Sequence, residues 1–487
     1  MRAIVIGSTK HLLFAAFYGA IGIAVAILFV AVWLLNDRPD LSLWHTTYLS
    51  NDYHQQSGLA NFEQYLALED KLFAEVDRKI YRKYQPKVAS PLNRYERHSL
   101  SDPALWQQNW NRSFEWKNPQ AEFGLLLLHG MSDSPYVIKH IAEHYQHQAH
   151  IIGLRLPGHG TIPSGLTNIT WSDLAGAVSL ASAHLADKLP GKPIYVAGFS
   201  TGAALALNHE LENISLNKPQ HFAGMIFLSP AVGLDPIAAG ANWQAKLGRL
   251  LGQDKLYWNS IQTEYDPFRY QSFAVNAGDV VYRLTLRNQA LLSNLTRQQY
   301  DKIPPILTFQ SVVDDTVSSL SVVERLYQHL PASKGHQLVL FDVNRKHSLN
   351  QLMLNDPLNP FAPFWLTTPL PYRLSLLEND LQQADVVQVR ELANTDQFAD
   401  TQTLALSWPR DVYSLSHLAL PFPVEDTLYG PLVSEESDKI QIGRGIYQGE
   451  RGVLSVTAAD MLRQKWNPFY PYMMSRMDEF TQHRPSM

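Results

Sequence analysis

The chain of 487 residues can bury a large core, because 45% of its residues are hydrophobic. Charged residues make up 17% and the formal net charge is −5, so the composition gives no electrostatic sign of nucleic-acid binding. Cysteine is absent, which excludes disulfides, thiolate catalysis and cysteine-ligated metals, and leaves the redox compartment undecided.

An apolar stretch without charged residues runs from His11 to Leu35. At about 1.5 Å per residue, a helix of this length exceeds the ~30 Å of bilayer hydrocarbon, which predicts a transmembrane anchor. A cleaved signal would have a shorter apolar run and a small-residue cleavage site, so we expect the anchor to be retained. Arg2 and Lys10 precede the span and the charges after it nearly cancel. Residues 1–10 are therefore expected in the cytoplasm and the remaining chain outside it, in the periplasm if the source is a Gram-negative bacterium.

The next segment, 36–118, is predicted to be a helical connector. Apolar residues recur there at helical spacing and form a stripe that predicts a packing helix: Phe62, Tyr65, Leu66, Leu68, Leu72, Phe73 and Val76. The polar, proline-interrupted stretch YQPKVASPLNRYERHSLSDP then indicates a loop-rich connection.

From Ala121 onward, apolar strand-like runs alternate with helical segments. The runs are EFGLLLLHG, HIIGLRLPGHG, KPIYVAGFS, FAGMIFLSP, PPILTFQSV and HQLVLFDV. Strands that are apolar throughout and separated by helices are typical of a parallel sheet covered on both faces. The sequence therefore predicts an α/β fold.

One serine stands between two glycines where the third of these runs meets a helix. The stretch Gly198-Phe199-Ser200-Thr201-Gly202 has the G-x-S-x-G pattern of a nucleophile elbow in its expected strand-turn-helix context. The small flanking residues allow the sharp turn that exposes the hydroxyl. The alternative, an ordinary turn serine, fits the pattern alone but not its context.

Acyl transfer from such a serine also needs donors for the developing oxyanion. In this architecture one donor is the backbone N–H after the nucleophile, here Thr201, and the other comes from the loop after an earlier strand. The stretch LLLLHGMSDS supplies that loop, with Gly130 at its turn and Met131 as the expected donor. We expect His129 to order the loop rather than to take part in the chemistry.

The acid and the base are expected later in the chain, in the order Ser, Asp, His. The run ILTFQSVVDDTV ends in Asp314 and Asp315; Asp314 is favoured because it comes first after the strand, and Asp315 is the alternative. Two histidines have a suitable position. His347 follows the last apolar run, whereas His417 lies between short hydroxyl residues and an apolar, proline-rich run.

Taken as a set, the motifs LLLLHGMSDSPY, LRLPGHGT, GFSTG and FQSVVDDTV resemble those of the α/β-hydrolase superfamily, in its monoacylglycerol lipase, lysophospholipase and carboxylesterase branch. The stretches EYDPFRYQSFAVNA and SLSHLALPFPVEDTLYG further resemble an uncharacterised bacterial, membrane-anchored group with a C-terminal extension. The resemblance implies an α/β-hydrolase fold with a mostly parallel sheet and helices on both faces. It also favours His417 over His347, because the segment around His417 looks characteristic of that group.

Two further segments lie outside a minimal hydrolase fold. The stretch between FAGMIFLSP and PPILTFQSV is rich in aromatic residues and predicts a cap over the site. The C-terminal part contains strand-like YRLSLLEND and DVVQVREL and an aromatic, methionine-rich end, which suggests docking on the core or on a bilayer surface. The expected division is 1–10 cytoplasmic, 11–35 anchor, 36–118 connector, 119–232 and 303–350 hydrolase core, 233–302 cap and 351–487 extension.

The expected function is a membrane-anchored serine hydrolase that cleaves carboxylic, lipid-like esters through an acyl-enzyme, without metal or organic cofactor. Ser200 would attack, a histidine would take its proton, Asp314 would hold that histidine, and Met131 and Thr201 would bind the oxyanion. The alternatives are a non-catalytic scaffold with the same fold, and a peptidase or thioesterase with the same triad.

Overall fold

The fold is taken from a computed structural model of the chain. The structure describes residues 14–23, 25–26, 37–86, 88–233, 248, 252–346, 351–365, 370–380, 386–392, 400–432, 438–443 and 456–482. The predicted anchor lies largely outside these ranges; residues 14–23 and 25–26 are helical. Within the ranges that are described, no helix is both long and apolar enough to cross a bilayer.

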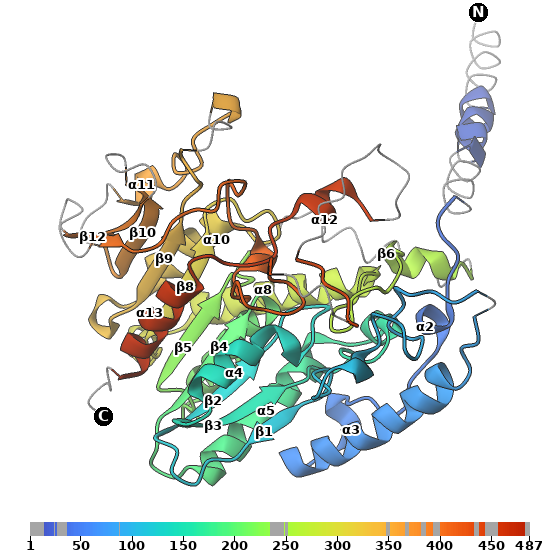
Figure 1. The fold of residues 1–487 in the computed structure, drawn as a ribbon, viewed down its shortest axis with the longest axis horizontal. Helices are drawn as coiled ribbons and strands as arrows, with labels where there is room; N and C mark the ends of the chain where they lie inside the picture. The colour runs from blue at the N-terminus through green and yellow to red at the C-terminus, as the bar shows by residue number, and fades with distance from the viewer. Residues whose placement is uncertain are drawn as a thin grey trace, which may run out of the picture.

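A single sheet of ten strands forms the centre of the molecule (Figure 1). Across the sheet the strands follow the order β1 (Phe114–Trp116), β3 (Ala149–Leu154), β2 (Phe123–Leu128), β4 (Ile194–Phe199), β5 (Gly224–Leu228), β8 (Ile306–Ser311), β9 (Gln337–Phe341), β10 (Arg373–Asn379), β11 (Val387–Leu392) and β12 (Asp400–Leu404). The strands from β3 to β10 pair in parallel, and antiparallel pairs occur at both edges. Every residue of β2, β3, β4, β5 and β8 is buried, as the apolar runs predicted.

Helices cover both faces of this sheet, and alternate strand residues separate the two cores. Leu126 and Leu128 of β2 face a core shared with α5 (Trp171–Lys188), α6 (Thr201–Ser215), α8 (Val275–Asn294) and α10 (Ser319–Arg325). Leu125 and Leu127 face a second core shared with α4 (Lys139–Tyr145) and α13 (Tyr470–Gln482). The predicted α/β class with helices on both faces is therefore correct.

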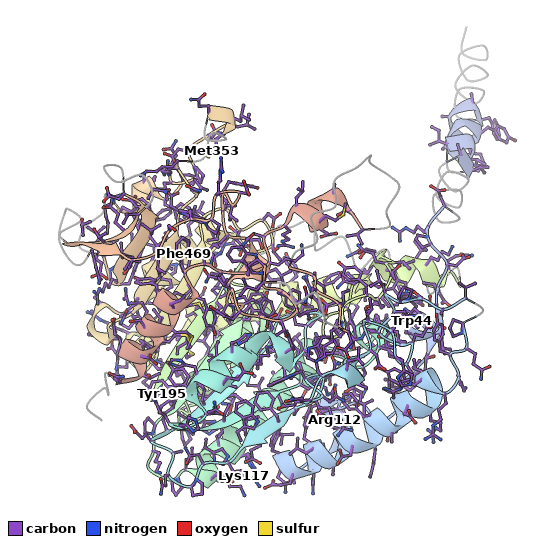
Figure 2. All side chains as sticks on the ribbon, in the orientation of Figure 1. Trp44, Arg112, Lys117, Tyr195, Met353 and Phe469 are labelled. Carbon is purple, nitrogen blue, oxygen red and sulfur yellow. The ribbon has the colours of Figure 1, made fainter. Side chains whose placement is uncertain are left out.

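The C-terminal extension is built into the sheet. Strand β10 pairs in parallel with β9, and β11 and β12 continue the sheet in antiparallel pairs. Helix α13, red in Figure 1, returns to the central strands, where the Tyr195 hydroxyl of β4 donates to the carbonyl of Thr481 over 3.0 Å. Tyr195 is labelled in Figure 2. Of the two expected docking surfaces, the structure shows α13 on the core.

The connector before the sheet holds α2 (Leu43–Thr46) and α3 (Phe62–Val76). Phe62, Tyr65, Leu72 and Val76 of the predicted stripe are buried. The Glu69 carboxylate of α3 lies 2.9 Å from the buried Arg155 guanidinium, which follows β3. Farther toward the N-terminus, Trp44 (Figure 2) belongs to a small separate core. The predicted packing helix thus contacts the hydrolase core.

Of the predicted cap segment, 233–302, the structure describes residues 233, 248 and 252–302. It contains β6 (Trp258–Ser260), β7 (Phe273–Ala274), α8 and α9 (Arg297–Tyr300). Helix α8 packs on α6, where Asn288 accepts from Asn208 over 2.9 Å and donates to the Ala204 carbonyl over 2.8 Å. Part of the predicted cap is therefore a helix of the core layer. Residues 234–247 and 249–251 of this segment lie outside the described residues, and the cap itself stays a prediction. Two short helices, α11 (Ala362–Trp365) and α12 (Ala458–Leu462), lie in the extension.

Candidate active site

Ser200 occupies a sharp turn between β4 and α6. Its backbone has φ 52° and ψ −112°, a conformation that side-chain-bearing residues adopt at a cost of about 1–3 kcal/mol. The Ser200 amide donates to the Leu228 carbonyl of β5 over 2.9 Å, which ties the strained turn to the next strand. The sheet and α6 therefore hold this serine in the geometry of a nucleophile elbow.

The two elbow glycines are required by close backbone approach. A Cβ on Gly198 would lie 2.5 Å from the Ala203 amide nitrogen, and a Cβ on Gly202 would lie 2.4 Å from the Leu128 carbonyl oxygen. Both neighbours are backbone atoms, which cannot rotate away as a side chain can. The tight approach brings the start of α6, including Thr201, against the end of β2.

The loop after β2 has the features expected of an oxyanion loop. Gly130 leaves no room for a side chain, because its Cβ would lie 2.6 Å from a carboxylate oxygen of Asp133 and 3.1 Å from the Phe199 ring. Ser132 adopts φ 68°, and its carbonyl accepts from the Tyr270 amide over 2.9 Å. Met131 lies between these two positions, so its backbone amide is part of a constrained turn beside the elbow.

His129 is buried and joins two loops. Its Nε2 accepts from the Leu156 amide over 3.0 Å, so its Nδ1 carries the proton and donates to the Gly130 carbonyl over 2.8 Å. Burial, aided by the neighbouring His159, lowers the pKa of His129 well below its ordinary value. A neutral imidazole with both nitrogens engaged fits the ordering role expected from the sequence.

Asp314 follows β8 with its side chain fully buried. One carboxylate oxygen accepts from the Thr316 and Val317 amides over 2.9 and 3.1 Å, and the other accepts from the Gln310 side chain over 3.1 Å. Burial favours the neutral acid, but the charge and hydrogen bond of His417 and these amides outweigh it and hold the pKa of Asp314 below its ordinary value. Asp314 is therefore a buried carboxylate in the charged form.

His417 lies against this carboxylate. Its Nδ1 donates to Asp314 Oδ2 over 2.8 Å, which leaves Nε2 available to accept a proton. The imidazole also packs on the ring of Phe199, the residue directly before Ser200, with centroids 4.8 Å apart. The hydroxyl of Ser311 at the end of β8 donates to the Leu415 carbonyl over 2.8 Å and anchors the segment that carries His417.

The structure describes one of the two alternative site residues, Asp315, but not the other, His347. The side chain of Asp315 is 86% exposed and pairs with Arg463 at 3.3 Å, so Asp315 does not lie in the pair with His417. His347 lies outside the described residues. The structure thus brings Asp314 and His417 together beside the elbow.

Charged residues that the sequence analysis did not single out surround this centre. Asp133, in the oxyanion loop, is buried, and burial raises its pKa to about 6. The Nε of Arg269 lies 3.5 Å from Asp133 Oδ1. Asp133 could have been noticed from its place in LLLLHGMSDS, whereas no local pattern marks Arg269.

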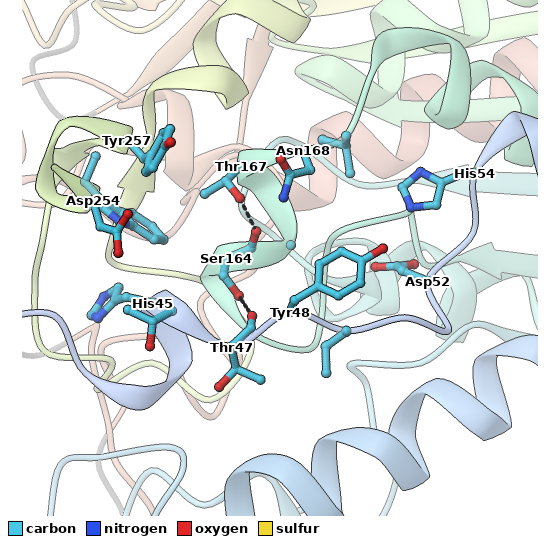
Figure 3. A pocket seen from close by; sticks show the side chains of 15 residues that line it. His45, Thr47, Tyr48, Asp52, His54, Ser164, Thr167, Asn168, Asp254 and Tyr257 are labelled. Carbon is cyan, nitrogen blue, oxygen red and sulfur yellow. Dashed lines mark hydrogen bonds between the residues drawn. The ribbon is translucent and has the colours of Figure 1, made fainter. Parts of the chain in front are cut away.

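A separate cavity of about 160 Å³ lies between the connector and the loop after β3 (Figure 3). Its polar groups bind one another: the Ser164 hydroxyl donates to the Thr47 carbonyl over 2.6 Å and Thr167 donates to the Ser164 carbonyl over 2.7 Å. None of the residues that line it belongs to the elbow, the oxyanion loop or the Asp314–His417 pair.

The fold is the α/β-hydrolase fold. Residues 125–342 match the model of the alpha/beta hydrolase family. A curated relative, the thermostable monoacylglycerol lipase of Bacillus sp. (strain H-257), is 30% identical over 129 residues, which are 26% of this chain. The matched part of the chain spans about half the length of that relative, 48%. The resemblance to the monoacylglycerol lipase-like branch is thus confirmed.

Solved structures are also similar. A structure reported for LipS and LipT, two metagenome-derived lipolytic enzymes, is 18% identical with a TM-score of 0.36, covering 50% of this chain and 94% of that one. The monoacylglycerol lipase of Paleococcus ferrophilus is 15% identical with a TM-score of 0.35, covering 47% and 86%. A soluble variant of the Saccharomyces cerevisiae monoglyceride lipase is 15% identical with a TM-score of 0.34, covering 47% and 81%.

Proposed function

We propose that this protein is a serine hydrolase that cleaves carboxylic, lipid-like esters through an acyl-enzyme. The observation that carries the proposal is the Asp314–His417 pair beside a serine in a strained elbow. The family match and the similarity to a monoacylglycerol lipase support a lipid ester as substrate.

In the proposed reaction the Ser200 hydroxyl attacks the ester carbonyl and His417 Nε2 takes its proton. Asp314 keeps the imidazole in the tautomer with the proton on Nδ1 and stabilises the imidazolium that forms. The Met131 and Thr201 amides bind the oxyanion of the tetrahedral intermediate. The imidazolium then protonates the leaving alkoxide. In the second half of the reaction His417 takes a proton from water, the water attacks the acyl-enzyme, and His417 returns the proton to Ser200 as the acid leaves.

The proposal includes attachment to a membrane by the apolar run from His11 to Leu35, with the hydrolase outside the cytoplasm. An anchored enzyme would meet lipid-like esters at the bilayer surface. Protection of the hydrolase domain from added protease in cells stripped of any outer membrane but with an intact cytoplasmic membrane, together with digestion after lysis, would contradict this orientation.

Labelling with a fluorophosphonate probe tests the chemistry. We expect labelling of the parent protein, none of Ser200→Ala, and strongly slowed labelling of His417→Ala, with His347→Ala as the matched variant that keeps labelling. Failure of the parent to react would contradict the proposal. Loss of labelling in His347→Ala and retention in His417→Ala would assign the base to His347.

A further inference from the structure

A second, more polar cavity adjoins the proposed catalytic centre. It has a volume of about 180 Å³ and is lined in part by Ser132 and Leu418. Ser132 directly follows the proposed oxyanion donor Met131, and Leu418 directly follows His417. Since a water occupies roughly 30 Å³ in the liquid, the cavity has room for a group of several non-hydrogen atoms.

Three cationic side chains line this cavity: Arg269, Arg463 and Lys465. Lys465 is 8% exposed, and its ammonium donates to the carbonyls of Asp460, Arg463 and Met461 over 3.1, 3.1 and 3.4 Å. Among the residues that the structure describes, no carboxylate lies within salt-bridge distance of this ammonium. These three carbonyls accept from all three N–H groups of the ammonium, so Lys465 contributes its positive charge to the cavity and not a free hydrogen-bond donor.

The two arginines of the cavity also have few hydrogen-bond and ion-pair partners among the described residues. The Arg269 Nε makes no hydrogen bond within the described structure, and its contact with Asp133 is 3.5 Å long. Arg463 reaches out of the cavity to Asp315 and Thr316. Burial and the nearby charge of Arg269 lower the pKa of Arg463, so the cations repel one another.

The two carboxylates that line the cavity accept hydrogen bonds from other groups, and the charge of Asp460 also acts on Arg463 and Lys465. Asp266 accepts from the Tyr429 hydroxyl and from the Phe268 and Arg269 amides. Asp460 accepts from the Thr457 hydroxyl over 2.7 Å at the start of α12. Three cations thus face a polar cavity with two lining carboxylates that already have donors, which favours an anion as the occupant.

The position of the cavity indicates which part of a substrate it would receive. In the proposed reaction His417 protonates the leaving alkoxide, so the alcohol part of the ester lies against the imidazole. Leu418, next in the chain, is in the cavity wall. The alcohol part is therefore the part of the substrate nearest the cations.

We propose that this cavity binds an anionic oxygen group, a phosphate or a carboxylate, on the alcohol part of the ester substrate, through the guanidinium groups of Arg269 and Arg463 and the positive charge of Lys465. This inference rests on the proposed function and narrows it. The preferred substrates are monoacyl esters whose alcohol carries a negative charge, such as an acylated glycerol phosphate, and uncharged monoacylglycerols are the poorer ones.

The test compares two esters with one acyl chain, 1-oleoylglycerol 3-phosphate and 1-oleoylglycerol, in micelles of an uncharged detergent. The measured quantity is the ratio of kcat/KM for the phosphate ester to that for the neutral ester. We expect a ratio well above one, and a fall of about tenfold in Lys465→Met, since the attraction between opposite charges close together in a protein contributes this much. Arg269→Gln is the second variant, because the side chain of Arg269 is less enclosed than that of Lys465. It should also lower the ratio.

Lys71→Met is the matched control, because Lys71 is exposed on α3. It should leave the ratio unchanged, and melting temperatures of all variants establish that each is folded. A ratio near one in the parent, or a ratio unchanged in both cavity variants, would overturn the inference. If the parent still reacts with the fluorophosphonate and cleaves the neutral ester, the proposed function survives that result.

Inhibition by inorganic phosphate tests whether the cavity binds the phosphate group of the substrate or only a free phosphate ion. We expect it to raise KM for the phosphate ester in the parent and to lose this effect in Lys465→Met. Equal inhibition of both proteins would place the phosphate site elsewhere. If phosphate inhibits the parent but the ratio of kcat/KM for the two esters is near one, the cavity binds free phosphate and not the substrate. This outcome and equal inhibition of both proteins each contradict the inference.

Discussion

His417 Nδ1 lies 2.8 Å from Asp314 Oδ2 although 103 positions separate them in the chain. Asp314→Asn replaces the accepting oxygen by an amide that favours the wrong imidazole tautomer. We expect kcat for ester hydrolysis to fall by about 10⁴-fold. The matched variant is Asp315→Asn, because that side chain is 86% exposed, and it should keep kcat within about twofold. Similar losses in both variants, measured with a soluble chromogenic ester, would contradict the assignment of the acid.

The strained backbone of Ser200 predicts a cost in stability. Ser200→Gly and Ser200→Ala both lack the nucleophile and should be inactive, but only glycine adopts φ 52° and ψ −112° without strain. The free energy of unfolding in urea should be about 1 kcal/mol higher for Ser200→Gly than for Ser200→Ala, after the entropy of glycine in the unfolded chain is subtracted. Equal stabilities would mean that the elbow stores no strain.

The close approach of α6 to β2 predicts that Gly202 tolerates no side chain. In Gly202→Ala the Cβ would lie 2.4 Å from the Leu128 carbonyl oxygen, and we expect a loss of about 1–3 kcal/mol of stability together with activity. Gly278→Ala in α8 is the control, since its nearest neighbour would be 3.9 Å away, and it should stabilise the protein by about 0.5–1 kcal/mol. Thermal unfolding of the two variants measures the difference, and a shift of the same sign in both would refute it.

The extension is tied to the core by an ion pair that predicts a pH dependence. His140 Nε2 lies 2.7 Å from the buried Asp426 Oδ2. Burial acts to lower the pKa of His140, but its hydrogen bonds to Asp426 and Glu143 outweigh it and raise the pKa above the ordinary value. A raised folded pKa gives stability that is complete below the unfolded pKa of about 6.5 and is lost as pH rises through the folded value.

The measurement is the difference in free energy of unfolding between the parent and His140→Gln. It should be largest near pH 5–6, where Asp426 is still charged, and shrink above about pH 7.5. His147→Gln, which removes an exposed imidazole that follows α4, is measured in parallel as the control. A difference for His140→Gln that grows with pH would have the wrong sign for this ion pair.

Much of the core was predictable because its signals are local. Six apolar runs predicted the six central strands, and G-x-S-x-G in its strand-turn-helix context predicted the turn at Ser200. The strand-like runs after residue 370 were also recognisable, but not their pairing with β9, because strand neighbours are set by contacts between distant segments. Its place directly after the strand favoured Asp314 over Asp315, and the structure shows that Asp314 contacts a histidine.

The rest of the site could not be read locally. Chain position left His347 and His417 open, and only the resemblance favoured the second. Arg269 and Lys465 lie almost two hundred residues apart in segments without a motif, so no spacing rule could have joined them. Their common feature is a shared cavity wall, which exists only after the extension has folded onto the core.

The order of Ser200 and His417 along the chain has a consequence for biosynthesis. Ser200 lies in the first half of the chain, but His417 follows β12, and α13 comes later still. A nascent polypeptide would therefore display its alcohol long before any proton acceptor reaches it. If the proposed triad is the one at work, the enzyme stays inert toward cellular esters until its final segments have been synthesised and have docked.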